Sequence, residues 1–90
     1  MNKSELVARI AELSELSKKD AEKALNSTVQ AIQEALVRKE KVVLTGFGTF
    51  EVKQRKARIG HDPRTGERIQ IPALNAPTFK AGKVLKDQVR

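Results

Sequence analysis

The segment Lys53-Gln54-Arg55-Lys56-Ala57-Arg58 carries four basic side chains in six positions. Because successive side chains of a strand point to opposite faces, each face of a strand formed here would carry two of these cations. A strand that is charged on both faces cannot lie flat on an apolar core. We therefore expect this segment to project into solvent.

A turn follows this basic segment. Asp62-Pro63-Arg64-Thr65-Gly66 combines a Pro and a Gly, the residue types that favour turns, and its flanks Lys53–Gly60 and Glu67–Ile71 can pair as a hairpin. An isolated hairpin is only marginally stable in water. The six basic residues between positions 53 and 68 face only two acidic ones. This imbalance favours a basic arm that becomes ordered on an anionic surface over a loop whose charges only aid solubility.

The N-terminal half has the pattern of two helices. Asn2 followed by Glu5 resembles a capping box, and Ser17 followed by Asp20 repeats the signal. After each start, apolar residues recur at helical spacing. These residues are Leu6, Ile10 and Leu13 in the first helix, and Ala21, Leu25, Val29, Ile32 and Leu36 in the second. The second helix is expected to end near Arg38-Lys39, where no Gly marks the boundary.

The pattern changes after residue 40. Lys41–Leu44 is rich in β-branched residues, and Thr49–Lys53 alternates apolar and polar residues, so both are expected to be strands separated by a turn at Gly46-Phe47-Gly48. Ala73–Lys80 is expected to be extended, and Pro77 suggests the edge of a sheet. Lys83–Arg90 is expected to form a short terminal helix. The predicted fold class is α+β.

Size and charge limit what the protein can be. Ninety residues with three Phe and no Cys predict one domain with a small core, without disulfides, for which subunit association is the expected remedy. Residues 1–40 carry seven basic and seven acidic side chains, whereas residues 41–90 carry eleven basic and four acidic ones. This asymmetry points to an anionic partner, either nucleic acid or a membrane surface. The sequence has neither a signal-peptide pattern nor an apolar membrane span, so a soluble, unexported protein is expected.

Several residues permit more than one interpretation. Gly46 and Gly48 either let the backbone approach a phosphate closely or form a purely structural turn; a third Gly, required for a dinucleotide fingerprint, is missing. Pro63 is explained by turn chemistry alone, although an apolar wedge between base steps is the functional alternative. Phe47, Phe50 and Phe79 are expected in the core, because they lie outside the basic arm. Without stacking aromatics in that arm, a single-strand binder is disfavoured.

Catalysis is not indicated by any group of residues. His61 is the only His and has no cluster of partner residues, and no nucleophile, base and orienting group can be assembled. We therefore expect no enzyme activity, no metal and no cofactor. Membrane-surface binding is disfavoured, because neither amphipathic helix has a Lys-rich polar face.

Four groups of residues resemble a known family. They are Asn2-Lys3-Ser4-Glu5-Leu6, Gly46-Phe47-Gly48-Thr49-Phe50, Gly60 with Pro63 and Thr65-Gly66, and Pro77 with Phe79, Gly82-Lys83 and Leu85-Lys86. Together they are similar to the HU/integration host factor family, and the similarity covers the whole chain. Because this chain ends at Val89-Arg90, it is more similar to the HU branch than to integration host factor, whose members are usually longer at the C-terminus and heterodimeric.

The resemblance implies an intertwined homodimer, with the possibility of a heterodimer with a paralogue. Residues 1–40 would form a helical dimerisation part and residues 41–90 a three-stranded antiparallel saddle, with a β-ribbon arm at about 54–74 and a short C-terminal helix. Phe47, Phe50 and Phe79 would belong to the dimer core. The implied location is the nucleoid of the cytoplasm.

The resemblance also implies architectural binding of double-stranded DNA without sequence preference, favouring bent, nicked or junction DNA. The arms would enter the minor groove, and Pro63 would wedge between base pairs. The implied contacts are Lys53, Arg55, Arg58, His61, Arg64 and Arg68, with Lys3, Lys83 and Lys86 along the flank and Gly46 and Gly48 at close backbone approaches. His61 and Asp62 stand where the family usually has Arg and Asn, which makes the tip less cationic. Sequence-preferring DNA bending and, less favoured, RNA binding are the alternatives.

Overall fold

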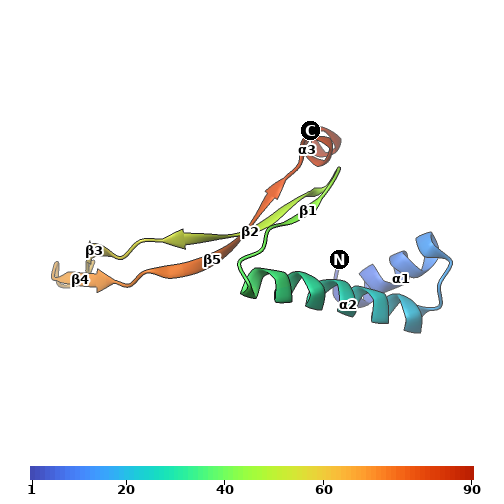
Figure 1. The fold of residues 1–90 in the computed structure, drawn as a ribbon, viewed down its shortest axis with the longest axis horizontal. Helices are drawn as coiled ribbons and strands as arrows, with labels where there is room; N and C mark the ends of the chain where they lie inside the picture. The colour runs from blue at the N-terminus through green and yellow to red at the C-terminus, as the bar shows by residue number, and fades with distance from the viewer. The chain divides into compact units, whose positions relative to one another are not determined.

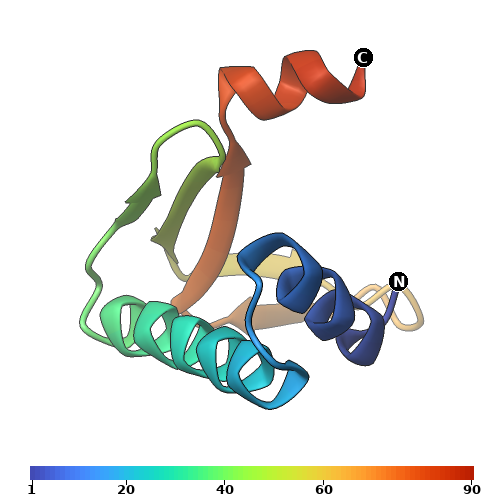
Figure 2. The same cartoon turned by 90° about the vertical axis from the view of Figure 1, so that its right-hand side faces the viewer.

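The computed structural model describes all residues, 1–90, which form two compact units, Met1–Ala35 and Leu36–Arg90. The first unit is a helical hairpin of α1, Lys3–Ser14, and the main part of α2, Lys18–Val37. Figure 2 shows the two helices joined by a short connection. Both predicted helices are confirmed, and α2 ends one residue before the predicted boundary.

Side chains at the predicted start positions cap both helices. The Asn2 Oδ1 atom accepts a hydrogen bond from the Glu5 amide at 2.9 Å, and the Ser17 Oγ atom accepts one from the Asp20 amide at 3.1 Å. Each bond satisfies an amide that has no partner within the helix. The two capping signals read from the sequence are thus confirmed.

The helical unit has a very small core. Only Val7, Ala21 and Ala35 are buried, whereas Leu13 on α1 is 69% exposed and Val29 on α2 is 45% exposed. A helix in a globular protein normally buries its apolar stripe against another element. Much of the apolar stripe of α2 therefore remains available to a further partner.

The second unit contains two antiparallel sheets and a helix. Strands β1 (Val42–Leu44), β2 (Gly48–Arg55) and β5 (Leu74–Ala81) form a three-stranded sheet in the order β1-β2-β5. Strands β3 (Arg58–His61) and β4 (Arg68–Ile71) form a separate two-stranded ribbon, and α3 covers Lys83–Val89. Figure 1 shows this ribbon continuing from the ends of β2 and β5. The predicted α+β class, the three-stranded sheet, the protruding arm and the terminal helix are confirmed.

The register of the sheet corrects one predicted pairing. Phe50 lies opposite Phe79, so the ladder continues until Arg55 lies opposite Leu74. Lys53–Arg55 therefore pairs with β5, and the prediction that it pairs with Glu67–Ile71 was wrong; only Arg58–His61 pairs with β4. The ladder is interrupted at residues 56–57 and 72–73, where Pro72 has no amide hydrogen to donate. The position of Pro77 on an edge strand, β5, is confirmed.

Two non-glycine residues adopt a left-handed backbone conformation at the ends of helices. Glu15 at the C-cap of α1 and Lys39 after α2 both have a φ of 60°. For residues with a Cβ atom this conformation costs roughly 1–2 kcal/mol. The missing Gly near Arg38-Lys39 is thus replaced by a strained Lys, which still completes the turn by donating its amide to the Leu36 carbonyl at 2.9 Å.

Replacing Glu15 with Gly should stabilise the protein by about 1 kcal/mol, because Gly adopts the left-handed conformation without a Cβ clash. Urea unfolding at one fixed protein concentration measures the change. Glu12→Gly, inside α1, is the matched control and should destabilise by about 1 kcal/mol. Equal destabilisation by both substitutions would contradict the argument from backbone strain.

Candidate nucleic-acid interface

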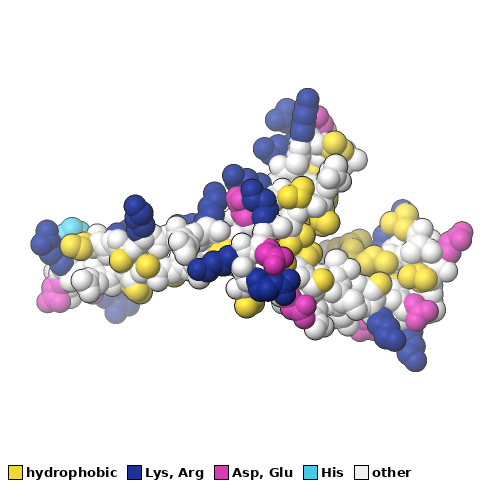
Figure 3. All heavy atoms as spheres, viewed as in Figure 1, with side chains coloured by type: hydrophobic (Ala, Val, Ile, Leu, Met, Phe, Trp, Pro, Cys, Tyr) yellow, Lys and Arg dark blue, Asp and Glu magenta, His cyan; other side chains and the backbone are white.

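The arm consists of β3, β4 and the adjoining ends of β2 and β5. Its six basic side chains are all exposed, and none of them makes an ion pair. They are Lys53, Arg55, Lys56, Arg58, Arg64 and Arg68. In Figure 3 dark blue side chains occur along this ribbon from the sheet to its tip. The sequence prediction of an exposed cationic arm is therefore confirmed in its geometry, and its charges are free to meet an anion.

The tip of the arm is a hydrogen-bonded turn. The Asp62 amide donates to the Glu67 carbonyl at 2.8 Å, and the Gly66 amide donates to the Asp62 carbonyl at 2.7 Å. The Asp62 Oδ1 atom accepts a hydrogen bond from the Arg64 amide at 2.8 Å. Gly66 has a φ of 73°, which explains why Gly occupies this position.

Pro63 lies inside this turn and is exposed. Its ring fixes the backbone angle that the turn needs, so the turn interpretation made from the sequence fits the structure. An exposed ring at the end of the arm also has the placement that a wedge requires. The two roles of Pro63 are therefore compatible.

The arm buries little of its own apolar surface. Ile59 is 60% exposed and Ile69 is 45% exposed. Gly60 lies opposite Ile69, and a Cβ atom there would lie only 2.9 Å from Ile71 Cδ1. His61 lies opposite Arg68 and is exposed. With so little burial, the arm has the marginal stability expected of an isolated hairpin.

The polar face of the three-stranded sheet adds two cations that sequence analysis did not select. Glu51 on β2 lies 3.5 Å from the Lys80 ammonium on β5 and 4.0 Å from the Lys41 ammonium beside β1. These residues are 29 and 10 positions from Glu51 in the chain, so only the strand register brings them together. The alternation of side chains along a strand places Thr49, Glu51 and Lys53 on the same face. Nothing in the sequence around Glu51, however, identifies the two lysines as its partners.

The opposite face of the sheet carries the aromatic residues. The Phe79 ring centroid lies 4.8 Å from that of Phe50 and 5.3 Å from that of Phe47. Phe47 remains 45% exposed and Phe79 41% exposed. The three rings therefore form one cluster, and a single chain does not cover it.

The two glycines of the turn have different environments. A Cβ atom on Gly48 would lie 2.5 Å from the Lys80 carbonyl oxygen and 2.5 Å from Phe79 Cζ, so the close approach at Gly48 is made to its own sheet. Gly48 is buried, which favours the structural interpretation of this residue. Gly46 is exposed, has a φ of 86° and has open space around its Cα. Of the two, only Gly46 offers a free backbone approach.

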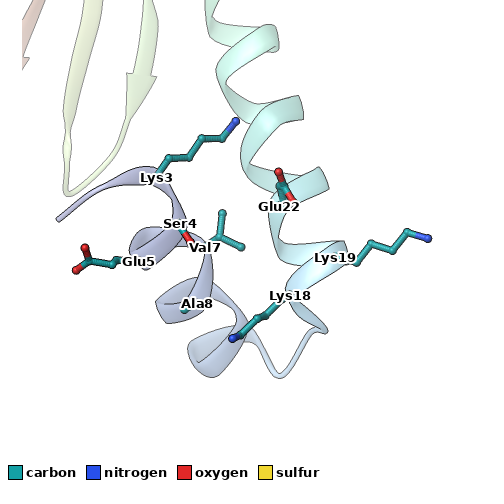
Figure 4. Close-up of a pocket in the computed structure, with 8 residues that line it drawn as sticks. All are labelled: Lys3, Ser4, Glu5, Val7, Ala8, Lys18, Lys19 and Glu22. Atoms are coloured by element: carbon teal, nitrogen blue, oxygen red, sulfur yellow. The ribbon is translucent and has the colours of Figure 1, made fainter.

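The remaining predicted contacts lie on helices. Lys83 and Lys86 are exposed on α3. Lys3 is exposed in the first turn of α1 and lines a groove between α1 and α2, together with Val7, Lys18 and Glu22 (Figure 4). No three His, Cys, Asp or Glu side chains lie close enough together to hold a metal ion, and no helix is long and apolar enough to span a membrane.

These features define a class: a small basic α+β protein whose β-ribbon presents unpaired cations. The family described as bacterial DNA-binding protein matches residues 1–90, and the chain belongs to this family. The resemblance to HU proteins seen in the sequence is thereby confirmed.

Individual relatives have the same extent as this chain. It is 56% identical over 89 residues to the DNA-binding protein HU of Clostridium pasteurianum, covering 99% of this chain and 98% of that protein. It is also 56% identical over 89 residues to the DNA-binding protein HU 1 of Bacillus subtilis (strain 168), covering 99% and 97%. Among solved structures, Anabaena HU in a cocrystal with DNA has a TM-score of 0.91 at 45% identity, covering 99% and 97%. HU from Thermotoga maritima has a TM-score of 0.70 at 34% identity, covering 100% of both chains.

Proposed function

We propose that this protein binds double-stranded DNA without base-sequence preference, bends it and compacts the bacterial chromosome. The observation that carries the proposal is the exposed β-ribbon with six basic side chains and no ion pair, in a member of a DNA-binding family. The family is one of DNA-binding proteins and not an enzyme family. Its place in the cell is then the nucleoid in the cytoplasm.

Counterion release supplies the affinity. Each phosphate that a Lys or Arg neutralises releases condensed cations from the duplex, and log K falls by about 0.9 per phosphate for each tenfold rise in salt. Such contacts are made to the backbone and carry no sequence information. An arm whose cations have no internal partner contributes its full charge to this effect. Lys3, Lys83 and Lys86 would extend the same contacts along the flank.

Two copies of the chain form the binding unit. A single chain fully buries no large side chain, and its Phe47 and Phe79 rings are almost half exposed. An apolar groove of about 250 Å³ at the end of α2, lined by Leu36, Val52 and Pro77 among others, offers a place for apolar side chains of a second copy. The helical hairpins of both copies would intertwine, and Phe47, Phe50 and Phe79 would belong to the shared core. A paralogue with the same apolar pattern could replace one copy.

The two arms of the dimer enter the minor groove. Pro63 inserts between base steps and kinks the duplex, with His61 and Arg64 beside it in the groove. Bending a duplex of about 20–30 base pairs by about 40–90° costs of order 1–6 kcal/mol, and the additional phosphate contacts offset this cost. Duplexes that are already bent, nicked or branched avoid part of the cost, so the protein favours them.

If the dimer holds the fold together, the melting temperature should rise with protein concentration, because association stabilises only the folded state. Thermal unfolding over about a hundredfold range of concentration tests this, with sedimentation measured at both ends of the range. A constant melting temperature together with a sedimenting monomer would rule out the dimer.

Arg55→Ala together with Arg58→Ala should weaken binding to random and defined duplexes by the same factor. The slope of log K against log salt should become shallower by about 0.9 for each arginine that contacts a phosphate. Fluorescence anisotropy titrations at several salt concentrations measure both quantities.

Arg9→Ala is the matched control, because Arg9 lies on α1 and already pairs with Glu12 at 3.3 Å. This control should leave the slope unchanged. A strong preference of the unmodified protein for one defined duplex would instead indicate a sequence-preferring DNA-bending protein. Equal or tighter binding of a matched RNA hairpin would indicate an RNA-binding protein.

Pro63→Ala should reduce DNA bending more than affinity, because the arm cations remain while the wedge is lost. Energy transfer between dyes at the two ends of a duplex measures the bend. On a duplex with a central nick, where bending costs less, the two proteins should give more similar bends. Identical bend angles on intact DNA would eliminate the wedge role.

A further inference from the structure

Glu51 is the one acidic side chain on the polar face of the β1-β2-β5 sheet. Its carboxylate lies between two ammonium groups, with Oε1 3.5 Å from Lys80 Nζ and Oε2 4.0 Å from Lys41 Nζ. Its side chain is 19% exposed, whereas the Lys41 and Lys80 side chains are 61% and 64% exposed. One shielded carboxylate thus holds two solvent-facing cations, one from each side of its own strand.

The other ion pairs of the protein are different. Arg9 pairs with Glu12, Arg38 with Glu40, and Arg90 with Asp87, all within three positions in the chain and all with both side chains more than half exposed. Glu51 alone pairs across strands and is largely shielded from water. Its Oε1 atom is buried and accepts no hydrogen bond, although the Lys80 ammonium lies nearby.

This geometry is a poor way to gain stability. Removing a carboxylate oxygen from water costs free energy, and an exposed ammonium group at 3.5 Å offsets that cost only in part. Thr78, opposite Glu51 in the ladder, donates its hydroxyl to the Glu51 backbone carbonyl at 3.3 Å and leaves the carboxylate without help. The arrangement is better explained by its effect on the two lysines.

We propose that Glu51 is an internal competitor for phosphate, which offsets one of the two positive charges of Lys41 and Lys80 and so restrains binding of DNA to the sheet. The inference rests on the proposed DNA-binding function. A lysine can meet a phosphate fully only by leaving the carboxylate, so the pair exchanges one anion for another. The net number of counterions that these lysines release from DNA is therefore reduced.

The consequence is an uneven distribution of binding strength along β2. Lys53 and Arg55 lie on the same face of the strand as Glu51, towards the arm, and make no ion pair. Towards the arm the cations are free, whereas around Glu51 they are held. Glu51 thus lowers affinity for every duplex alike and leaves the arm to dominate the salt dependence.

Glu51→Gln in the full-length protein tests the proposal, because Gln keeps the shape and removes the charge. The substitution should tighten binding to a random-sequence duplex at low salt. The slope of log K against log salt should become steeper by about 0.9 per protomer, because the substitution removes one negative charge and so frees one net positive charge for a phosphate. Glu12→Gln is the control, since it makes the same charge change beside one exposed arginine on α1. Equal slopes for Glu51→Gln and Glu12→Gln would overturn the proposal.

Removing both lysines, in the presence of Glu51 and in the Glu51→Gln background, provides a second test. Lys41→Ala with Lys80→Ala should flatten the slope by about 0.9 per protomer when Glu51 is present, because the carboxylate already offsets one of the two ammonium charges. In the Glu51→Gln background the same pair of substitutions should flatten the slope by about 1.8 per protomer. Equal flattening in the two backgrounds would show that the lysines bind phosphate regardless of the carboxylate and would overturn the proposal. Thermal unfolding of each variant verifies folding, and a lack of salt-dependent binding by the unmodified protein would refute the DNA-binding function itself.

Discussion

The chain cannot bury its own apolar residues, and the rest of the structure depends on this constraint. Val7, Ala21 and Ala35 are its only buried apolar side chains, and none of them is large. Full burial of a Val, Leu or Phe contributes roughly 1.5–3 kcal/mol, so a chain that leaves most of these residues exposed has little to offset the entropy of folding. A second copy that covers the aromatic cluster and the stripe of α2, as proposed above, would resolve the deficit. Association would then be part of folding itself and would supply two arms in one step.

The same shortage of burial explains the arm. A ribbon that packs on nothing has no core to disrupt, so it tolerates cations on both faces. Charge pairing changes along the ribbon that β2 and β5 begin. Within the three-stranded sheet Glu51 pairs with Lys41 and Lys80, whereas on the arm no acid pairs with any cation. Packed apolar residues and free cations thus occupy different parts of one ribbon, which is interrupted at residues 56–57 and 72–73, and the free cations lie where the chain buries little apolar surface.

The helices, strands and turns could be predicted from patterns between residues close in the sequence. The pairing of strands that are distant in the sequence could not be predicted in this way. Capping by Asn2 and Ser17 depends on neighbours three residues away, so spacing alone revealed it. The projection of the arm followed from charges on both faces of one segment. Pairing of Arg55 with Leu74, by contrast, is fixed by the distant alignment of Phe50 with Phe79. The same alignment brings Lys80 to Glu51 and packs Phe79 over Gly48, so the roles of these residues became visible only with the register.

The tip of the arm, residues 61–68, and its stem, residues 53–58, carry different net charges and are therefore suited to different roles. From His61 to Arg68 two acidic residues balance two arginines, so the tip is formally neutral with His61 uncharged, whereas Lys53 to Arg58 contains four cations and no acid. Electrostatic attraction must therefore come from the stem. At the tip, the Asp62 carboxylate is engaged by the Arg64 amide, and the turn holds Pro63 outward. Under the proposed function, the cations of the stem would therefore determine how strongly the arm binds, and the shape of the tip would determine how far the duplex is bent.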